Sequence, residues 1–169
     1  MSTYNFFVTS LIIILIPGTG VAYTISEGIS KGKRASLYAT FGCMIGIIPH
    51  LCISMMLSSL LLSMSTTVFF IMKLVGSIYL LYLGMGMIFS KTEVKKENVV
   101  AEKQPIWIIR RGVLINLLNP KLTLFFFAFL PQYVSTTDGA YIFQSGIYGL
   151  VFMLLTGVVF MGYGFLQAF

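Results

Sequence analysis

The sequence predicts an all-α integral membrane protein, and three observations support this fold class. Of its 169 residues 57% are hydrophobic and 9% are charged, whereas about 25% are charged in an ordinary soluble domain. The mean hydropathy is +0.94. The long apolar runs show no strand-like alternation, and helices satisfy their own backbone hydrogen bonds in lipid. This composition excludes a disordered chain, a nucleic-acid-binding protein and a small disulfide-linked scaffold, and it makes membrane lipid the expected surroundings.

The spacing of charged residues divides residues 1–169, a single membrane domain, into five predicted transmembrane helices. No charge precedes Glu27, which leaves room for the first span. Between Arg34 and Lys91 the only charge is Lys73, and this interval fits two helices of about 20 residues each. We expect Lys73 to extend its side chain to the headgroups. The predicted spans cover about residues 5–25, 37–62, 68–89, 112–134 and 140–168.

The short loops predict the orientation of the chain in the membrane. Three of the eleven Lys and Arg residues follow the first span, and six lie between the third and fourth spans. The other two connections carry no Lys or Arg. Because cytoplasmic loops are enriched in basic residues, we expect loops 26–36 and 90–111 in the cytoplasm and the N-terminus outside. The net charge of +6 is therefore a topology signal.

Proline and glycine interrupt the first predicted span near its middle, in the run Pro17-Gly18-Thr19-Gly20. Proline frees a backbone carbonyl, and glycine tolerates unwound conformations. Loose backbone groups inside the membrane are tolerated only where protein or a water-lined cavity takes them up. We expect local unwinding here, with the Thr19 hydroxyl as one partner for the freed groups.

The fourth span is interrupted by Asn119, Pro120 and Lys121, roughly eight residues after its start. A charge at this depth costs several kcal/mol unless it pairs or faces a cavity, so Lys121 is a candidate functional residue. Two structural alternatives stay open for Lys121. Its side chain can extend to the cytoplasmic face, or it can pair inside the bundle.

The two interrupted spans resemble each other. Leu11–Pro17 and Leu114–Pro120 share Leu, Ile, Leu and Pro at matching places, 103 residues apart, and Gly42 matches Gly146 at an offset of 104. Because the two spans cross in opposite directions, the pattern predicts an inverted repeat of three plus three spans. Secondary transporters with this architecture hold the substrate at the paired broken helices. The same offset places a sixth span near residue 172, beyond the end of this chain.

Several segments, in order along the whole chain, resemble the LysE/RhtB superfamily of amino-acid exporters. The Asn-Pro-Lys block with its downstream Pro-Gln is the most specific of them. The resemblance implies export of amino acids or related small metabolites across the bacterial inner membrane, by secondary transport and as a homodimer. The matching segments are residues 17–20, the glycines of the second span, and residues 76–84, 116–121 and 129–134.

Two departures from the superfamily pattern affect the expected activity. Thr19 stands where members usually carry a second proline, and members tend to have about six spans where five are predicted here. We therefore expect a C-terminally truncated product. An inactive or accessory membrane protein derived from such a transporter is the alternative to an active exporter.

The broken helices and the resemblance together predict a substrate cavity at the bilayer midplane between spans one and four. Unwound carbonyls would take the substrate ammonium, and free amides or Lys121 would attract its carboxylate. The residues expected to line this cavity are Pro17, Gly18, Thr19, Gly20, Asn119, Pro120 and Lys121.

His50 and Glu27 are the candidates for proton coupling, because no Asp or Glu lies deep in a predicted span. Histidine titrates near neutral pH, and a hydrogen-bonded structural role is the alternative for His50. Glu27 lies at the cytoplasmic end of the first span. Paired acids, Ser/His arrangements and metal ligands at depth are lacking, so we expect neither an enzyme nor a metal or other cofactor.

Overall fold

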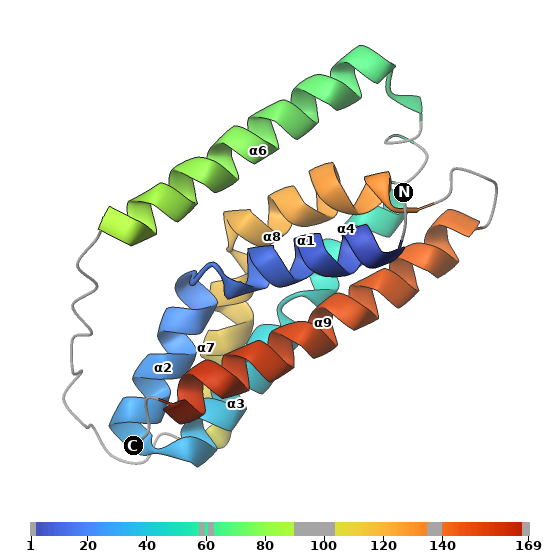
Figure 1. The fold of residues 1–169 in the computed structure, drawn as a ribbon. Helices are drawn as coiled ribbons and strands as arrows, with labels where there is room; N and C mark the ends of the chain where they lie inside the picture. Colours follow the sequence, from blue (N-terminus) through green and yellow to red (C-terminus); the bar gives the residue numbers. More distant parts are fainter. Residues whose placement is uncertain (1–2, 58–59, 61–62, 90–103, 135–139, 167–169) are drawn as a thin grey trace.

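The computed structural model describes residues 3–57, 60, 63–89, 104–134 and 140–166, and within these ranges the chain forms helices and no strands. This confirms the predicted all-α membrane class. Figure 1 shows most helices gathered in one bundle, with α6 running along its side. The elements are α1 (Thr3–Leu15), α2 (Thr19–Lys31), α3 (Lys33–Ile45), α4 (Ile48–Met56), α6 (Thr66–Phe89), α7 (Pro105–Leu117), α8 (Pro120–Leu124), a π-helical turn η1 (Phe125–Phe129), a 3-10 turn η2 (Leu130–Gln132) and α9 (Ala140–Leu166).

Two spans of the bundle are bent helix pairs, and each bend lies where the sequence predicts a break. α1 and α2 meet at an angle of 54°, and α7 meets the segment Pro120–Gln132 at 51°. Three further segments are long and apolar enough to cross a membrane: Lys33–Met56, Thr66–Gly86 and α9. Counting each bent pair as one span, the described part of the chain has up to five segments that could cross a membrane by length and composition. The inverted repeat itself stays a prediction.

The helix that opens the fourth span begins earlier than predicted. α7 starts at Pro105, so the end of the predicted loop 90–111 is helical, while residues 90–103 lie outside the described ranges. Proline suits the first helical turn. Arg110 lies over the Trp107 ring at 5.3 Å, and Arg111 lies over the Tyr23 ring at 5.5 Å. Each arginine lies over an aromatic ring, which stabilises its charge on the helix. The two charges therefore lie within α7 and do not mark its first residue.

The helix of the second span also begins before the predicted start of that span, and the membrane boundaries themselves stay a prediction. α3 begins at Lys33, directly after Gly32, whose φ of +81° favours glycine. This tight connection leaves no room for the longer loop expected between the first two spans. At the other end α4 stops at Met56, and part of the predicted remainder lies outside the described residues.

Glycines bring the backbones of α3 and α7 into contact. A Cβ added at Gly42 would lie 2.3 Å from the carbonyl oxygen of Ile109, and one at Gly112 would lie 2.9 Å from that of Ala39. Small residues commonly permit such close approach between helices in membranes. The contact fixes α7 against α3 and thereby sets the place where α7 ends.

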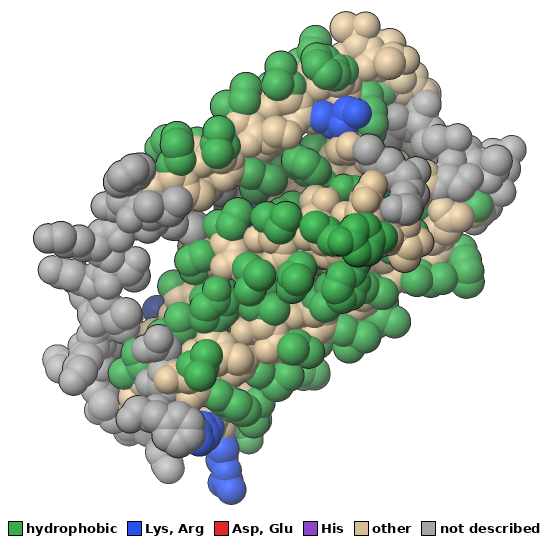
Figure 2. All heavy atoms as spheres, in the orientation of Figure 1, with side chains coloured by type: hydrophobic (Ala, Val, Ile, Leu, Met, Phe, Trp, Pro, Cys, Tyr) green, Lys and Arg blue, Asp and Glu red, His purple; other side chains and the backbone are tan. Residues whose placement is uncertain are grey.

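The visible outside of the molecule is mostly apolar. Figure 2 shows hydrophobic side chains over most of this face, with Lys and Arg side chains where α2 meets α3 and a further basic side chain beside α6 at the opposite end. We call the end where α2 meets α3 the basic end, defined by Lys31, Lys33, Arg34, Arg110 and Arg111. The distribution fits a surface that faces lipid along its length and water at the basic end.

Candidate substrate site at the crossing of the broken helices

The two breaks meet inside the bundle. A Cβ added at Gly18 would lie 3.3 Å from Nζ of Lys121 and 3.9 Å from Nδ2 of Asn119, although more than 100 residues separate these positions in sequence. Gly18 and Lys121 are also equivalent positions in the predicted repeat, at the offset of 103. The end of α1, the start of α2, the end of α7 and the start of α8 therefore converge at one place, which we call the crossing.

Lys121 neutralises the end of α1. Its side chain is buried, and Nζ donates hydrogen bonds to the carbonyl oxygens of Ile13 at 3.0 Å and Ile16 at 2.8 Å. The last carbonyls of a helix lack partners within the helix and carry its negative dipole end. The ammonium has three donors, so two serve α1 and a third is left. Of the alternatives left open by the sequence, the geometry matches pairing inside the bundle.

The start of α2 presents amides to the same place. Its first main-chain bond runs from the amide of Ala22 to the carbonyl of Gly18, and no side chain caps this end. The amides of the first turn therefore have no partner within the helix and form its positive end. Such helix starts are ready sites for a carboxylate.

Two asparagines shape the other side of the crossing. Oδ1 of Asn119 accepts from the amide of Lys121 at 3.1 Å and so caps α8. Nδ2 of Asn116 donates to the carbonyl of Cys43 at 2.8 Å, which ties α7 to α3. Oδ1 of Asn116 lies 2.6 Å from where a Cβ of Gly20 would be, so glycine is needed at that position.

A small cavity of about 10 Å³ lies at the crossing. A space of this size holds about one water molecule, so an amino acid enters only if the surrounding helices move apart. Its walls combine the polar groups described above with apolar side chains. The lining residues are Ile14, Gly18, Gly20, Asn116, Asn119, Lys121, Leu122, Phe152, Thr156 and Phe160.

His50 spans the second break from α4. Its Nε2 lies 3.1 Å from the carbonyl oxygen of Asn116 at the end of α7, and its Nδ1 lies 3.4 Å from Oγ1 of Thr123 on α8. The ring is buried. His50 therefore contacts both halves of the broken helix and is placed to respond to a change in the bend.

The structure gathers some of the predicted site residues and separates others. Gly18, Gly20, Asn119 and Lys121 line the cavity. Pro17, Thr19 and Pro120 are exposed and do not line it, so Thr19 is not the hydroxyl partner that we expected inside the crossing. The prolines break the helices without contributing to the cavity wall.

Glu27 and Asn116 complete the comparison with the prediction. Glu27 lies on α2 seven residues beyond Gly20, about 10 Å along the helix axis at 1.5 Å per residue. Asn116 was missed as a site residue although it begins segment 116–121, which resembles the superfamily. An amide within an apolar run, one turn before the proline, was the available signal. Among the described residues, no group of three His, Cys, Asp or Glu side chains is placed to hold a metal ion.

A membrane bundle in which two broken helices meet at a polar crossing has the architecture of secondary transporters. The chain matches the LysE type translocator family over residues 11–169 and belongs to that family. This confirms the resemblance seen in the sequence.

Curated relatives agree with the family. The chain is 30% identical over 163 residues to an uncharacterized membrane protein of Vibrio cholerae, covering 96% of this chain and 79% of that protein. It is 24% identical over 138 residues to leucine efflux proteins of Salmonella choleraesuis and Salmonella paratyphi A, covering 81% of this chain. The match spans 65% of the length of each leucine efflux protein. No solved structure matches.

Proposed function

We propose that the protein exports amino acids from the cytoplasm across the bacterial inner membrane by secondary transport, and that the crossing is its substrate site. The observation behind this proposal is the convergence of two opposite backbone ends at one cavity, with Lys121 as the only charged side chain in its lining. A zwitterion needs a partner for each of its charges, and the crossing offers the Lys121 cation for the carboxylate and oxygen acceptors with partial negative charge for the ammonium. Family membership supports the transport function, and no observation favours an inactive or accessory protein.

The substrate carboxylate binds between the start of α2 and Lys121 in this proposal. The unpaired first-turn amides of α2 supply donors and a positive partial charge. The remaining donor of the Lys121 ammonium supplies a full charge. Because the same ammonium holds the end of α1, a carboxylate that binds it also changes the interaction that fixes the bend.

The ammonium and side chain of the substrate contact the opposite wall. Oδ1 of Asn116 is an acceptor beside Gly20, and the end of α7 contributes the negative end of a helix dipole. Phe152, Phe160 and Leu122 make the remainder of the wall apolar. This wall, and the names of the two leucine efflux relatives, favour leucine or a similar apolar amino acid as substrate.

Transport requires the crossing to open alternately toward each side, because a cavity of about 10 Å³ is too small for an amino acid. We place the basic end in the cytoplasm, since basic residues gather there. The bends of 54° and 51° are the points at which the helix halves would rotate. A homodimer in membrane lipid is the assembly that we propose for the active state.

His50 is our candidate for proton coupling. In the neutral ring, Nε2 donates to the Asn116 carbonyl while Nδ1 accepts from Thr123. Protonation makes both nitrogens donors, so the Thr123 hydroxyl has to reverse its direction. This exchange would link the charge of one side chain to the geometry of the break.

Accumulation of radiolabelled L-leucine in inside-out membrane vesicles tests the function. Vesicles that contain the protein should accumulate leucine above empty vesicles, in a saturable manner and with loss of accumulation when a protonophore is added. Equal accumulation with and without the protein for leucine and the other apolar amino acids would contradict the proposal.

A further inference from the structure

Glu27 is a buried carboxylate that the crossing does not use. It is the one acidic side chain among the described residues, and 7% of it is exposed. Nζ of Lys31, one helical turn further along α2, lies 2.6 Å from its Oε2. The Lys31 side chain is 24% exposed, so the ion pair joins a buried anion to a cation that reaches water.

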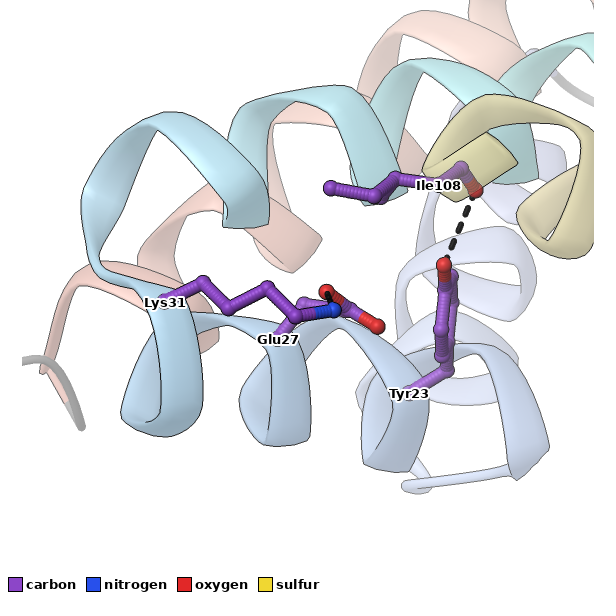
Figure 3. Close-up of polar contacts among 4 residues, drawn as sticks. All are labelled: Tyr23, Glu27, Lys31 and Ile108. Atoms are coloured by element: carbon purple, nitrogen blue, oxygen red, sulfur yellow. Dashed lines mark hydrogen bonds and ion pairs between the residues drawn. The ribbon is translucent and has the colours of Figure 1, made fainter. Parts of the chain in front are cut away.

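The surroundings of Glu27 connect α2 to α7 at the basic end. Tyr23, one turn before Glu27, donates its hydroxyl hydrogen to the carbonyl oxygen of Ile108 at 2.9 Å. The guanidinium of Arg111 lies over the same Tyr23 ring. In Figure 3 the Glu27 carboxylate has one oxygen on the Lys31 ammonium and the other directed toward Tyr23. The carboxylate thus lies beside the hydrogen bond from Tyr23 to Ile108 that joins α2 to α7.

We propose that Glu27 forms a binding site for the primary ammonium group of the amino acid on its way to the crossing, with the Lys31 ammonium as the resident occupant that it displaces. The inference rests on the proposed export function. The occupant itself indicates the chemistry of the site, because Lys31 presents a primary alkylammonium, the same group as the α-ammonium of an amino acid.

The two partners differ in what it costs to separate them. Lys31 has a flexible four-carbon stem, and its ammonium is well hydrated once it moves into water. Glu27 stays buried when Lys31 leaves, and a buried carboxylate that loses the cation bonded to it is strongly unfavourable. A substrate ammonium that replaces Lys31 removes that penalty, so exchange of one ammonium for another is favoured over an empty site.

The position of Glu27 fits a step before the crossing. Glu27, Thr24 and Gly20 lie on one face of α2, at the i, i+4 and i+7 positions counted from Gly20. Gly20 lines the crossing cavity, and Glu27 lies about 10 Å nearer the basic end. Along α2, the carboxylate therefore lies between the basic end and the crossing.

Opposite effects of two substitutions test this site. We compare uptake of radiolabelled L-leucine into inside-out vesicles by the wild type, Glu27→Gln and Lys31→Gln, with the exposed Arg34→Gln as a control for lost charge at the basic end. Loss of one charge-assisted hydrogen bond should raise the KM of Glu27→Gln about tenfold. Lys31→Gln removes the competitor and should lower the KM severalfold. Arg34→Gln should match the wild type, with kcat little changed throughout.

A purely structural ion pair gives a different result, because removal of either partner breaks the same bond. Equal shifts of KM in the same direction for Glu27→Gln and Lys31→Gln, or an unchanged KM for Glu27→Gln, would overturn the site while leaving export intact. If the wild type transports no leucine, equilibrium binding of L-leucine to the purified protein separates the export proposal from the Glu27 site. Weaker binding by Glu27→Gln and tighter binding by Lys31→Gln would then support the Glu27 site without export. No binding by the wild type would overturn both the export proposal and the Glu27 site.

Discussion

Replacing Lys121 by Met tests what the buried ammonium contributes at the crossing. Met has a similar length and no donor, so the substitution removes both hydrogen bonds to the end of α1, to Ile13 and Ile16, with little change in volume. It also removes the positive charge that we assign to substrate binding. The structure therefore predicts an effect on stability and an effect on export, and the two have different sizes.

The effect on stability is the smaller one. A hydrogen bond from a charged donor contributes about 1.5–3 kcal/mol, so two of them amount to about 3–6 kcal/mol. Burying an ammonium in the middle of a membrane span costs about 2.5–3.5 kcal/mol, which the Met variant does not incur. The two terms largely offset each other and leave a net loss of about 0–3 kcal/mol, so we expect Lys121→Met to insert and fold.

The effect on export should be close to complete. Without the ammonium, the substrate carboxylate meets only partial charges at the start of α2, and the carbonyls of Ile13 and Ile16 at the end of α1 lose their donor. We measure leucine uptake into inside-out vesicles together with the thermal unfolding midpoint in detergent. Lys73→Met is the matched control, because it makes the same substitution on α6, where Lys73 lies over the Phe69 ring at 5.1 Å.

The expected result is loss of uptake in Lys121→Met at near-normal abundance in the membrane, with Lys73→Met like the wild type. Uptake at the wild-type rate in Lys121→Met would refute the role of this ammonium in transport. Failure of Lys121→Met to accumulate as folded protein would refute the energy comparison. The two hydrogen bonds from Lys121 to the end of α1 would then outweigh the cost of burying its ammonium.

Three further predictions concern the crossing and its support. Gly20→Ala should abolish leucine uptake, because the added methyl group meets Oδ1 of Asn116 at 2.6 Å, whereas Gly146→Ala, which faces open space, should leave uptake unchanged. His50→Gln keeps a donor for the α7 carbonyl but cannot carry a proton, so its uptake should lose the pH dependence of the wild type, and a wild-type pH profile would remove His50 from proton coupling. Gly42→Ala should lower the free energy of unfolding by about 1–3 kcal/mol, measured by denaturant titration in detergent, and an unchanged value would show that α3 and α7 separate easily.

The sequence was sufficient for the fold class and for the position of the breaks. Proline and glycine interrupt helices through local backbone chemistry, so Pro17 and Pro120 predicted both bends without knowledge of the neighbours. The depth of Lys121 in an apolar span likewise marked it as a candidate functional residue, with pairing inside the bundle left open as an alternative. These features depend on the residue type and on the surrounding membrane, and both can be inferred from the sequence alone.

The partners were not predictable in the same way. Lys121 bonds to backbone carbonyls of Ile13 and Ile16, which carry no side-chain signal, across more than 100 residues of sequence. Thr19 was expected to face inward, but its place on the first turn of α2 turns it outward. Such outcomes depend on the rotation of each half-helix about its axis, and that rotation is set by tertiary packing such as the glycine contacts between α3 and α7.

The central claim, that the amino acid passes through the crossing, is tested most directly by protection of a single thiol. Gly18→Cys places a thiol beside Lys121, and Gly84→Cys places one in the apolar groove between α1 and α6, each on a background without Cys43 and Cys52. L-leucine should slow alkylation at Gly18→Cys, half-maximally at the concentration that half-saturates uptake, and should leave Gly84→Cys unaffected. Leucine protection at Gly84→Cys with none at Gly18→Cys would contradict the account, because the substrate path would then lie along α6.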